Sequence, residues 1–357
     1  MTELPEAAVY LAEAGRWAPS ADNMQPWLFR WRDGLLELRF ARKRLGEGPL
    51  GPTSPATQLA MGAVIENWQQ AAASAGLALD WLDRPDDPEL YARVRVPEAP
   101  FARPRPDEVA LFGRCTNRGR FRDRPLPPGL EERLAGLEEP PASLRLTREP
   151  DEIQRLAGLT RRASSVRFRT GELHQWFVGS LRWTAEEAER GDGLDLETLA
   201  LPPGGRWVLR AVASWPRLRR LNRLGAFRLL ASLEARPLAE APGLVLVHAP
   251  DDPASLRAAG QTMQRAWIAL NRAGLAVQPF YVLPDQLKRL AEGRVPAAME
   301  PEIRAVAEEA RGFQPPEGGR LLMVLRLGEP AAVAVPARRL PLERLIETAG
   351  GAPADER

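Results

Sequence analysis

The chain has 357 residues, of which 44% are hydrophobic and 27% charged, a composition typical of a globular protein with a buried core. The formal net charge is only +2 despite a pI near 9.0, so basicity does not indicate nucleic-acid binding. One cysteine and two histidines exclude an internal disulfide and any cysteine- or histidine-rich metal site. Without a long apolar run or a basic signal-like start, we expect a cytoplasmic protein with no membrane partner.

The first marked feature is the segment Arg16–Trp27, RWAPSADNMQPW, which joins an N-terminal helix to a strand. Proline fixes its backbone, and Ser20, Asn23 and Gln25 offer donors and acceptors that suit the edge of a flat heteroaromatic ring. A purely structural loop is the alternative, but it gives less reason for so many hydrogen-bonding side chains beside a tryptophan.

Regular elements follow this loop. The stretch 27–40, WLFRWRDGLLELRF, predicts a hairpin with its turn at Asp33–Gly34. A long apolar helix is expected at 58–79. The stretch from Pro85 to Pro106 is proline-rich, and we expect it to link two halves of the chain.

A second marked feature is the run from Arg114 to Phe121, RCTNRGRF. Two arginines, Arg114 and Arg118, stand four residues apart with the hydroxyl of Thr116 between them. This arrangement suits a phosphate, because guanidinium groups bind it bidentately and the hydroxyl adds one further bond. A solvated basic turn is the alternative, since arginine is abundant in this chain.

A long stretch from about 165 to 237 carries an apolar residue at every third position between 212 and 230, with many arginines between. Attachment to an anionic membrane surface is one interpretation. Pro216 breaks the helix, however, and residues spaced three apart do not stay on one face of a helix with about 3.6 residues per turn. We therefore favour packing of the apolar side on the protein core.

The remaining elements indicate an internal repeat. Short buried strands are expected at 243–250 and 320–330, and a second apolar helix at 256–277. At an offset of 198 this helix aligns with the first, so that Gly62 meets Gly260. Two unrelated alanine-rich helices ending in glycine remain the alternative. The mixed order of strands and helices predicts an α+β fold.

The loop and the arginine run together carry a family resemblance. Residues 18–27, APSADNMQPW, closely resemble the APSxxNxQPW segment of nitroreductase-family flavoproteins, and residues 114–118 resemble that family's RxSxR phosphate motif with threonine for serine. The resemblance implies the nitroreductase-like α+β fold, with mainly antiparallel sheets enclosed by helices, and one FMN. It covers roughly 10–80, 112–127, 256–282 and 320–345.

The resemblance also implies roles for individual residues. Ser20 and Asn23 contact the flavin ring or ribityl chain, while Gln25 supports the loop and Pro19 fixes its path. Arg114 and Thr116 hold the phosphate and ribityl group, and Arg118 lies near flavin N1 and O2, where a cation stabilises the reduced anion. Further cofactor-binding positions are Pro279 and Phe280, whose backbone approaches N5 and O4, and Arg338 and Arg339, which complete the phosphate pocket.

The motifs divide between two halves, which we place at 1–106 and 107–357. The loop occurs only in the first half and the arginine motif only in the second, so one complete site is expected across the interface of an internally duplicated pseudo-dimer. This resembles the duplicated, single-chain Acg-like branch of the superfamily. The insert at about 165–237 replaces the second loop, and we expect it to form a lid near the flavin.

Two functions remain open. The first is an oxidoreductase that passes electrons from NADH or NADPH to a nitro, quinone or similar electron-poor substrate. Hydride transfer at the flavin needs no protein acid or base, so we expect neither a catalytic side chain nor a metal. The second is an FMN storage or sequestration protein of the Acg-like type. We expect a monomer or a loosely assembled homodimer.

Overall fold

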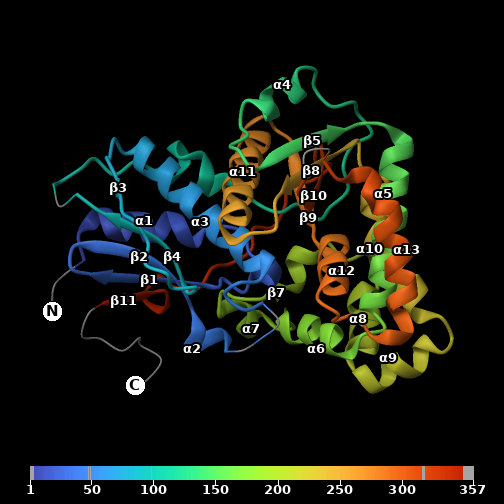
Figure 1. Ribbon diagram of the computed structural model, residues 1–357. Helices are drawn as coiled ribbons and strands as arrows, with labels where there is room; N and C mark the ends of the chain where they lie inside the picture. Colours follow the sequence, from blue (N-terminus) through green and yellow to red (C-terminus); the bar gives the residue numbers. More distant parts are fainter. Residues whose placement is uncertain (1–3, 47, 49, 98, 316–317, 349–357) are drawn as a thin grey trace.

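Two sheets and a central pair of helices organise the chain. The computed structural model describes residues 4–46, 48, 50–97, 99–315 and 318–348. The first sheet has the strand order β11-β1-β2-β4-β3 and the second β5-β8-β10-β9. Except for the parallel β1–β11 pair, both consist of antiparallel pairs. Helices enclose the sheets, which confirms the expected α+β class with mainly antiparallel sheets (Figure 1).

The elements fall into three groups along the chain. The first half contains α1 (Glu6–Arg16), β1 (Trp27–Arg32), β2 (Leu35–Phe40), α2 (Arg42–Leu45), α3 (Pro55–Ser74), β3 (Asp80–Trp81) and β4 (Leu90–Arg95). The second half contains α4 (Leu130–Ala135), β5 (Ser143–Thr147), α5 (Pro150–Arg167), β8 (Gly243–Ala249), α11 (Pro253–Arg272), β9 (Ala276–Phe280), α12 (Val282–Ala291), α13 (Glu300–Ala310), β10 (Arg320–Gly328) and β11 (Ile346–Thr348). The insert contains α6 (Gly171–Ser180), β6 (Leu181–Arg182), α7 (Ala185–Glu189), β7 (Leu194–Asp195), α8 (Gly205–Ala213), α9 (Trp215–Asn222) and α10 (Ala226–Ala239).

Local sequence explains the hairpin of the first half. β1 pairs with β2 from Trp27–Phe40 to Arg32–Leu35, which confirms the predicted hairpin. Asp33 and Gly34 both have positive φ, 52° and 74°, as a tight two-residue turn between twisted strands requires. Trp27 and Phe29 face the core, so the hairpin lays one face on α1 and α3.

The central helices α3 and α11 cross between the two sheets (Figure 1). A Cβ atom built on Gly62 would lie 2.1 Å from the Arg257 carbonyl oxygen, and one on Gly260 would lie 2.2 Å from that of Leu59. The offset of 198 that relates Gly62 to Gly260 also relates Leu59 to Arg257. The two contacts are therefore equivalent under the predicted repeat.

A second pair of contacts across the helices obeys the same symmetry. Gln264 Nε2 donates to Asn67 Oδ1 at 2.7 Å, and Arg265 Nη2 pairs with Glu66 Oε2 at 2.7 Å. Adding 198 to 66 and 67 gives 264 and 265, so each contact is the image of the other. The interface is isologous in the way that a twofold dimer interface is. This geometry supports the internal duplication.

One predicted boundary needs correction. The stretch from Pro85 to Pro106, expected to be a linker, contains β4, which pairs with β2 inside the first sheet. Leu90, Tyr91 and Val94 are buried in the core. Prolines 85, 88 and 97 lie before and after the strand, so every residue of β4 keeps a backbone N–H group for the sheet's hydrogen bonds.

The C-terminal segment returns to the first half. Beyond β10 the chain runs to β11, which pairs in parallel with β1 between Phe29 and Ile346. Leu340 and Leu345 are buried in the core cluster of the first half. The ranges 1–106 and 107–357 stay a prediction for the domains, and their ends, 1–3 and 349–357, lie outside the described residues. The second range thus contributes a strand to the first sheet.

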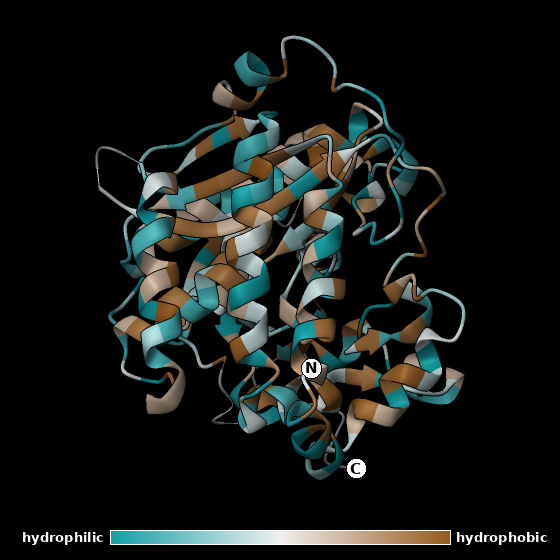
Figure 2. Ribbon diagram, turned by 90° about the vertical axis from the view of Figure 1, so that its right-hand side faces the viewer, coloured by the Kyte–Doolittle hydropathy of each residue, from teal (hydrophilic) through white to brown (hydrophobic). Residues whose placement is uncertain are grey.

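The insert folds mainly as short helices along the lower edge of Figure 1. As the sequence indicated, its apolar repeat is broken at Pro216, which stands in the first turn of α9. The expectation that its apolar side packs on the core holds only in part. Leu218 is buried, but Leu224 is 87% exposed. Figure 2, which looks from the side of α5, α10 and α13, shows helices carrying both hydrophobic and hydrophilic residues in front of largely hydrophobic strands.

The glycine contacts at the helix crossing generate a first prediction. Gly260→Ala places a methyl group against the Leu59 carbonyl and forces the helices apart, so we expect it to lower the free energy of unfolding by about 3 kcal/mol. Gly158→Ala on α5 is the matched control, because nothing lies within 4 Å of its Cβ position. That change should raise stability by about 0.5–1 kcal/mol. Urea denaturation measures both, and similar values for the two variants would contradict the crossing.

Candidate functional site

The loop between α1 and β1 has an unusual backbone. It includes the 3-10 helix η1 (Ala21–Asn23), and Asp22, Asn23 and Gln25 have φ values of 48°, 55° and 50°. Residues other than glycine rarely adopt this left-handed region, and glutamine is less suited to it than asparagine or aspartate. Such strain persists only where surrounding contacts fix the conformation, and it is concentrated at functional sites.

Two buried amides provide those contacts. Asn23 Nδ2 donates to the carbonyl oxygens of Gly193 and Arg338, at 3.1 and 3.0 Å. Gln25 Nε2 donates to Gly191 O at 2.9 Å, and the Leu340 amide donates to Gln25 Oε1 at 3.0 Å. The two side chains therefore tie the loop to the insert and to the C-terminal segment at once.

The loop residues expected to touch a flavin are thus engaged with the protein's own chain. Ser20 Oγ accepts a hydrogen bond from the Gln25 amide at 3.0 Å, and Pro19 is half-buried at the start of the loop. Gln25 ties the loop to the insert and the C-terminal segment, and its role in supporting a flavin stays a prediction. Direct contact of Ser20 and Asn23 with a ring stays a prediction.

An arginine cluster forms where three segments meet. Arg114 is buried and donates from Nη2 to Trp17 O at 3.0 Å. Its Cζ atom lies 4.7 Å from the centroid of the Trp267 ring. Arg339, from the C-terminal segment, donates from Nη1 to Asn23 Oδ1 at 2.9 Å and lies over the Trp17 ring. Arg16, at the end of α1, donates from Nη1 to Leu340 O at 3.0 Å.

The positive charge of this cluster is poorly compensated. Within the described ranges, neither Arg114 nor Arg339 forms an ion pair, and only Arg16 has a carboxylate partner, Glu13 at 2.7 Å. Burial lowers the pKa of Arg114 to about 10. Burial, together with the positive charges of Arg114 and Arg16, lowers the pKa of Arg339 to about 9. Both remain charged at neutral pH, at a cost that a bound anion would relieve.

Several donors of the cluster also lack partners. Arg114 Nε and Nη1 and Arg339 Nε are buried and form no hydrogen bond. An unmade hydrogen bond from a buried charged group is costly, so such groups are normally satisfied by protein, water or ligand. Convergent, unneutralised guanidinium groups with free donors suit a phosphate or another oxyanion. We therefore regard this cluster as the candidate anion site.

The rest of the arginine motif lies on the edge of β9. Thr116 forms a parallel bridge with Val277, and the Asn117 amide donates to Val277 O at 2.9 Å. The motif and the expected N5-proximal segment are thus neighbours. Pro279 is half-buried, and the Phe280 side chain lies in the core, so only its main chain is available to a ligand.

The two remaining predicted arginines bond to other groups. Arg118 donates from Nη1 to Thr198 O of the insert at 3.2 Å, and burial lowers its pKa although Asp22 nearby acts in the opposite direction. Arg338 is exposed and contributes only its carbonyl oxygen, which accepts from Asn23. Arg339 is therefore the member of the C-terminal pair that enters the site.

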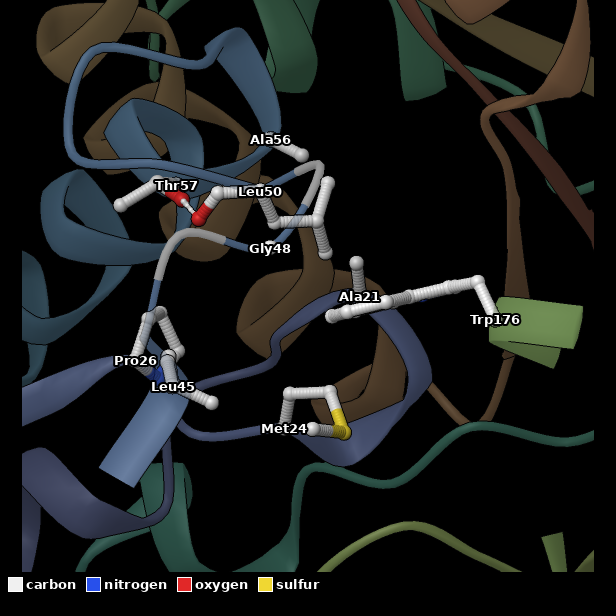
Figure 3. A pocket seen from close by; sticks show the side chains of 9 residues that line it. All are labelled: Ala21, Met24, Pro26, Leu45, Gly48, Leu50, Ala56, Thr57 and Trp176. Atoms are coloured by element: carbon white, nitrogen blue, oxygen red, sulfur yellow. Dashed lines mark hydrogen bonds between the residues drawn. The ribbon is translucent and has the colours of Figure 1, made fainter. Parts of the chain in front are cut away.

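A small apolar hollow borders the same loop. It is a shallow depression with little enclosed space. The indole of Trp176 extends from α6 toward Ala21 and Met24 (Figure 3), and its Nε1 donates to Asp22 Oδ2 at 3.0 Å. The loop thus borders both a cationic cluster and an apolar surface. The hollow is lined by Ala21, Met24, Pro26, Leu45, Gly48, Leu50, Ala56, Thr57 and Trp176.

Sequence reasoning missed several residues of the site. Arg16 adjoins the loop motif, and its position at a helix end beside Trp17 was an available signal. Trp267 lies in the repeat helix but carried no local indication of an arginine partner. Gly191 is 166 positions from Gln25, and only the folded chain brings the two together.

In the described part of the chain, no group of three or more His, Cys, Asp or Glu residues is arranged to hold a metal ion. No described helix combines the length and the apolarity needed to cross a membrane.

Comparison with known proteins gives the following. No protein-family model matches the chain. It is 27% identical over 279 residues to the uncharacterized protein MT1398 of Mycobacterium tuberculosis, an alignment that covers 75% of this chain and 38% of that protein. The chain thus spans well under half the length of this relative.

Solved structures show a distant likeness. An FMN-dependent nitroreductase, NfnB, from Mycobacterium smegmatis in complex with NADPH is 19% identical, with a TM-score of 0.34, over 66% of this chain and 95% of that one. An FMN- and NADPH-dependent NfnB from a Sphigopyxis strain is 16% identical, with a TM-score of 0.36, over 70% of this chain and 100% of that one. A BluB-like flavoprotein from Clostridium difficile is 14% identical, with a TM-score of 0.36, over 66% of this chain and 94% of that one.

The unneutralised cluster generates a second prediction. Arg114→Met removes a buried charge but keeps an apolar group over Trp267, so stability in phosphate-free buffer should stay equal or rise by about 1 kcal/mol. Inorganic phosphate should raise the melting temperature of the unaltered protein and not that of the variant. Arg161→Met, an exposed change on α5, is the control and should keep the response. An Arg114→Met variant that phosphate still stabilises would contradict an anion site.

Proposed function

We propose that the chain is a flavoprotein that binds one FMN and belongs to the duplicated, single-chain branch of the nitroreductase-like superfamily. The carrying observation is the arginine cluster, in which buried Arg114 and half-buried Arg339 have neither a carboxylate partner nor a full set of hydrogen bonds. The FMN phosphate fits such donors, because it is doubly charged and accepts several charge-assisted hydrogen bonds.

The division of the site between the halves supports the duplication. Arg114 comes from the second half, Arg16 and the loop come from the first, and Arg339 returns with the C-terminal segment. Arg114, Arg339 and Arg16 would hold the phosphate, and Thr116 would face the ribityl chain from the edge of β9. The main chain of Pro279 and Phe280, together with Ser20 and Asn23 of the loop, would face the ring.

We propose oxidoreductase activity with NADH or NADPH as the donor and a nitro, quinone or similar electron-poor acceptor. When bound, FMN supplies hydride transfer between nicotinamide and acceptor. The chain's own tasks are to orient the cofactor, to exclude water and to place positive charge near the ring, a role we assign to Arg118. The similar FMN- and NADPH-dependent nitroreductases motivate this choice of donor.

A storage or sequestration protein is the second candidate, and a specific observation favours it. Asn23 and Gln25 bond directly to Gly191 and Gly193 of the insert, and Arg118 bonds to Thr198. An insert held this way would cover the cofactor and keep a nicotinamide from stacking on it. The same contacts agree with the lid that we proposed for residues 165–237.

Anaerobic addition of NADH or NADPH to the FMN-loaded protein separates the two candidates. For an oxidoreductase, we expect the visible flavin band to disappear with at least one nucleotide, because the donor must reach the ring. Free FMN under the same conditions is the control for uncatalysed reduction. Retained colour with both nucleotides, together with rapid bleaching by dithionite, would reject the oxidoreductase and support storage.

A further inference from the structure

The insert contains a stretch with an extreme charge pattern. Between Glu197 and Glu234 the sequence has no acidic residue. The same stretch carries seven arginines: Arg206, Arg210, Arg217, Arg219, Arg220, Arg223 and Arg228. It therefore has a net charge of +7, whereas the whole chain has +2. Like charges at this density repel one another, so the arrangement destabilises the fold unless an anionic partner is bound.

The folded chain leaves these arginines without neutralisation. All seven side chains are exposed, on or beside α8, α9 and α10. None of the seven forms an ion pair with a described residue. By contrast, the exposed Arg155 on α5, Arg304 on α13 and Arg311 just after α13 each pair with a glutamate of the same segment. Glu234, the next acid in the sequence, is already paired with Arg167 at 2.7 Å. The seven positive charges are therefore exposed to solvent and available to an anionic partner.

Large apolar side chains lie exposed among the same helices. Trp207 is 76% exposed on α8, and Leu224 is 87% exposed in the turn between α9 and α10. Leu229 and Leu233, one turn apart on α10, are 62% and 50% exposed. Single exposed apolar residues need no explanation, but several within one basic segment mark an interaction site. α8 and α9 pack together, and α9 contacts α10, at the lower right of Figure 1.

We propose that α8, α9 and the first half of α10 form a surface that binds anionic lipid headgroups at a membrane. The pattern has the two components that such binding needs: arginines that are attracted to anionic headgroups, and Trp and Leu side chains that enter the headgroup–acyl boundary. Nucleic acid would use the arginines but leave the leucines unexplained. Binding is peripheral and reversible, and it does not depend on the proposed flavin site.

Vesicle binding of the full-length chain tests this surface. The expected result is sedimentation with vesicles of phosphatidylcholine mixed with phosphatidylglycerol, weakening with added salt, and little sedimentation with phosphatidylcholine alone. Arg219→Glu/Arg220→Glu and Trp207→Ser/Leu224→Ser should each lower the partition coefficient roughly tenfold or more. These side chains are exposed, so circular dichroism should show both variants folded.

Matched controls lie outside the surface. Arg161→Glu/Arg272→Glu reverses two exposed arginines on α5 and α11, and Val333→Ser removes an apolar side chain that is 97% exposed. Both should bind anionic vesicles as the unaltered chain does. Absence of vesicle binding would overturn the proposal, as would equal binding by the surface variants and the unaltered protein. Retention on heparin without vesicle binding would assign the surface to a soluble polyanion instead and would equally overturn it.

Discussion

The crossing of α3 over α11 at Gly62 and Gly260 is the contact on which the rest of the structure depends. A side chain larger than hydrogen at either position would meet a backbone carbonyl of the other helix. Close approach lets Asn67 reach Gln264 and Glu66 reach Arg265, so the halves are fixed in one relative orientation. That orientation brings Trp17 at the end of α1 to Arg114, which belongs to the other half.

The C-terminal segment and the insert supply the remaining contacts of the strained loop. Pairing of β11 with β1 brings Arg339 and Leu340 to the strained loop, where Gln25 Oε1 accepts a hydrogen bond from the Leu340 amide. The insert contributes Gly191 and Gly193 as acceptors for the loop's buried amides. Positive φ at three loop residues is stabilised by these bonds. The result concentrates cationic groups and unmade hydrogen bonds in one place, an arrangement that lowers stability and that a bound anion would compensate.

Local patterns predicted what is local. Strand alternation around Asp33–Gly34 predicted the hairpin, and the alignment of two apolar helices at Gly62 and Gly260 predicted an internal repeat. The spacing of Arg114 and Arg118 suited a shared phosphate site, yet Arg118 bonds to Thr198. Arg339 was expected near the pocket from the family resemblance, whereas Arg16, which bonds to Leu340 beside it, was not. These contacts depend on tertiary paths, which no short motif encodes. Likewise, the prolines around β4 made a strand there unexpected. The exposure of Trp207 and Leu224 depends on how the insert packs.

The central claim is that the arginine cluster holds the phosphate of a flavin nucleotide. Titration of the flavin-free protein with FMN and with riboflavin, followed by quenching of flavin fluorescence, tests it most directly, because the two ligands differ only in the phosphate. The account predicts that FMN binds about a hundredfold more tightly than riboflavin, since two charge-assisted hydrogen bonds are worth that much. Equal affinities for the two ligands, or failure to bind FMN at all, would contradict it.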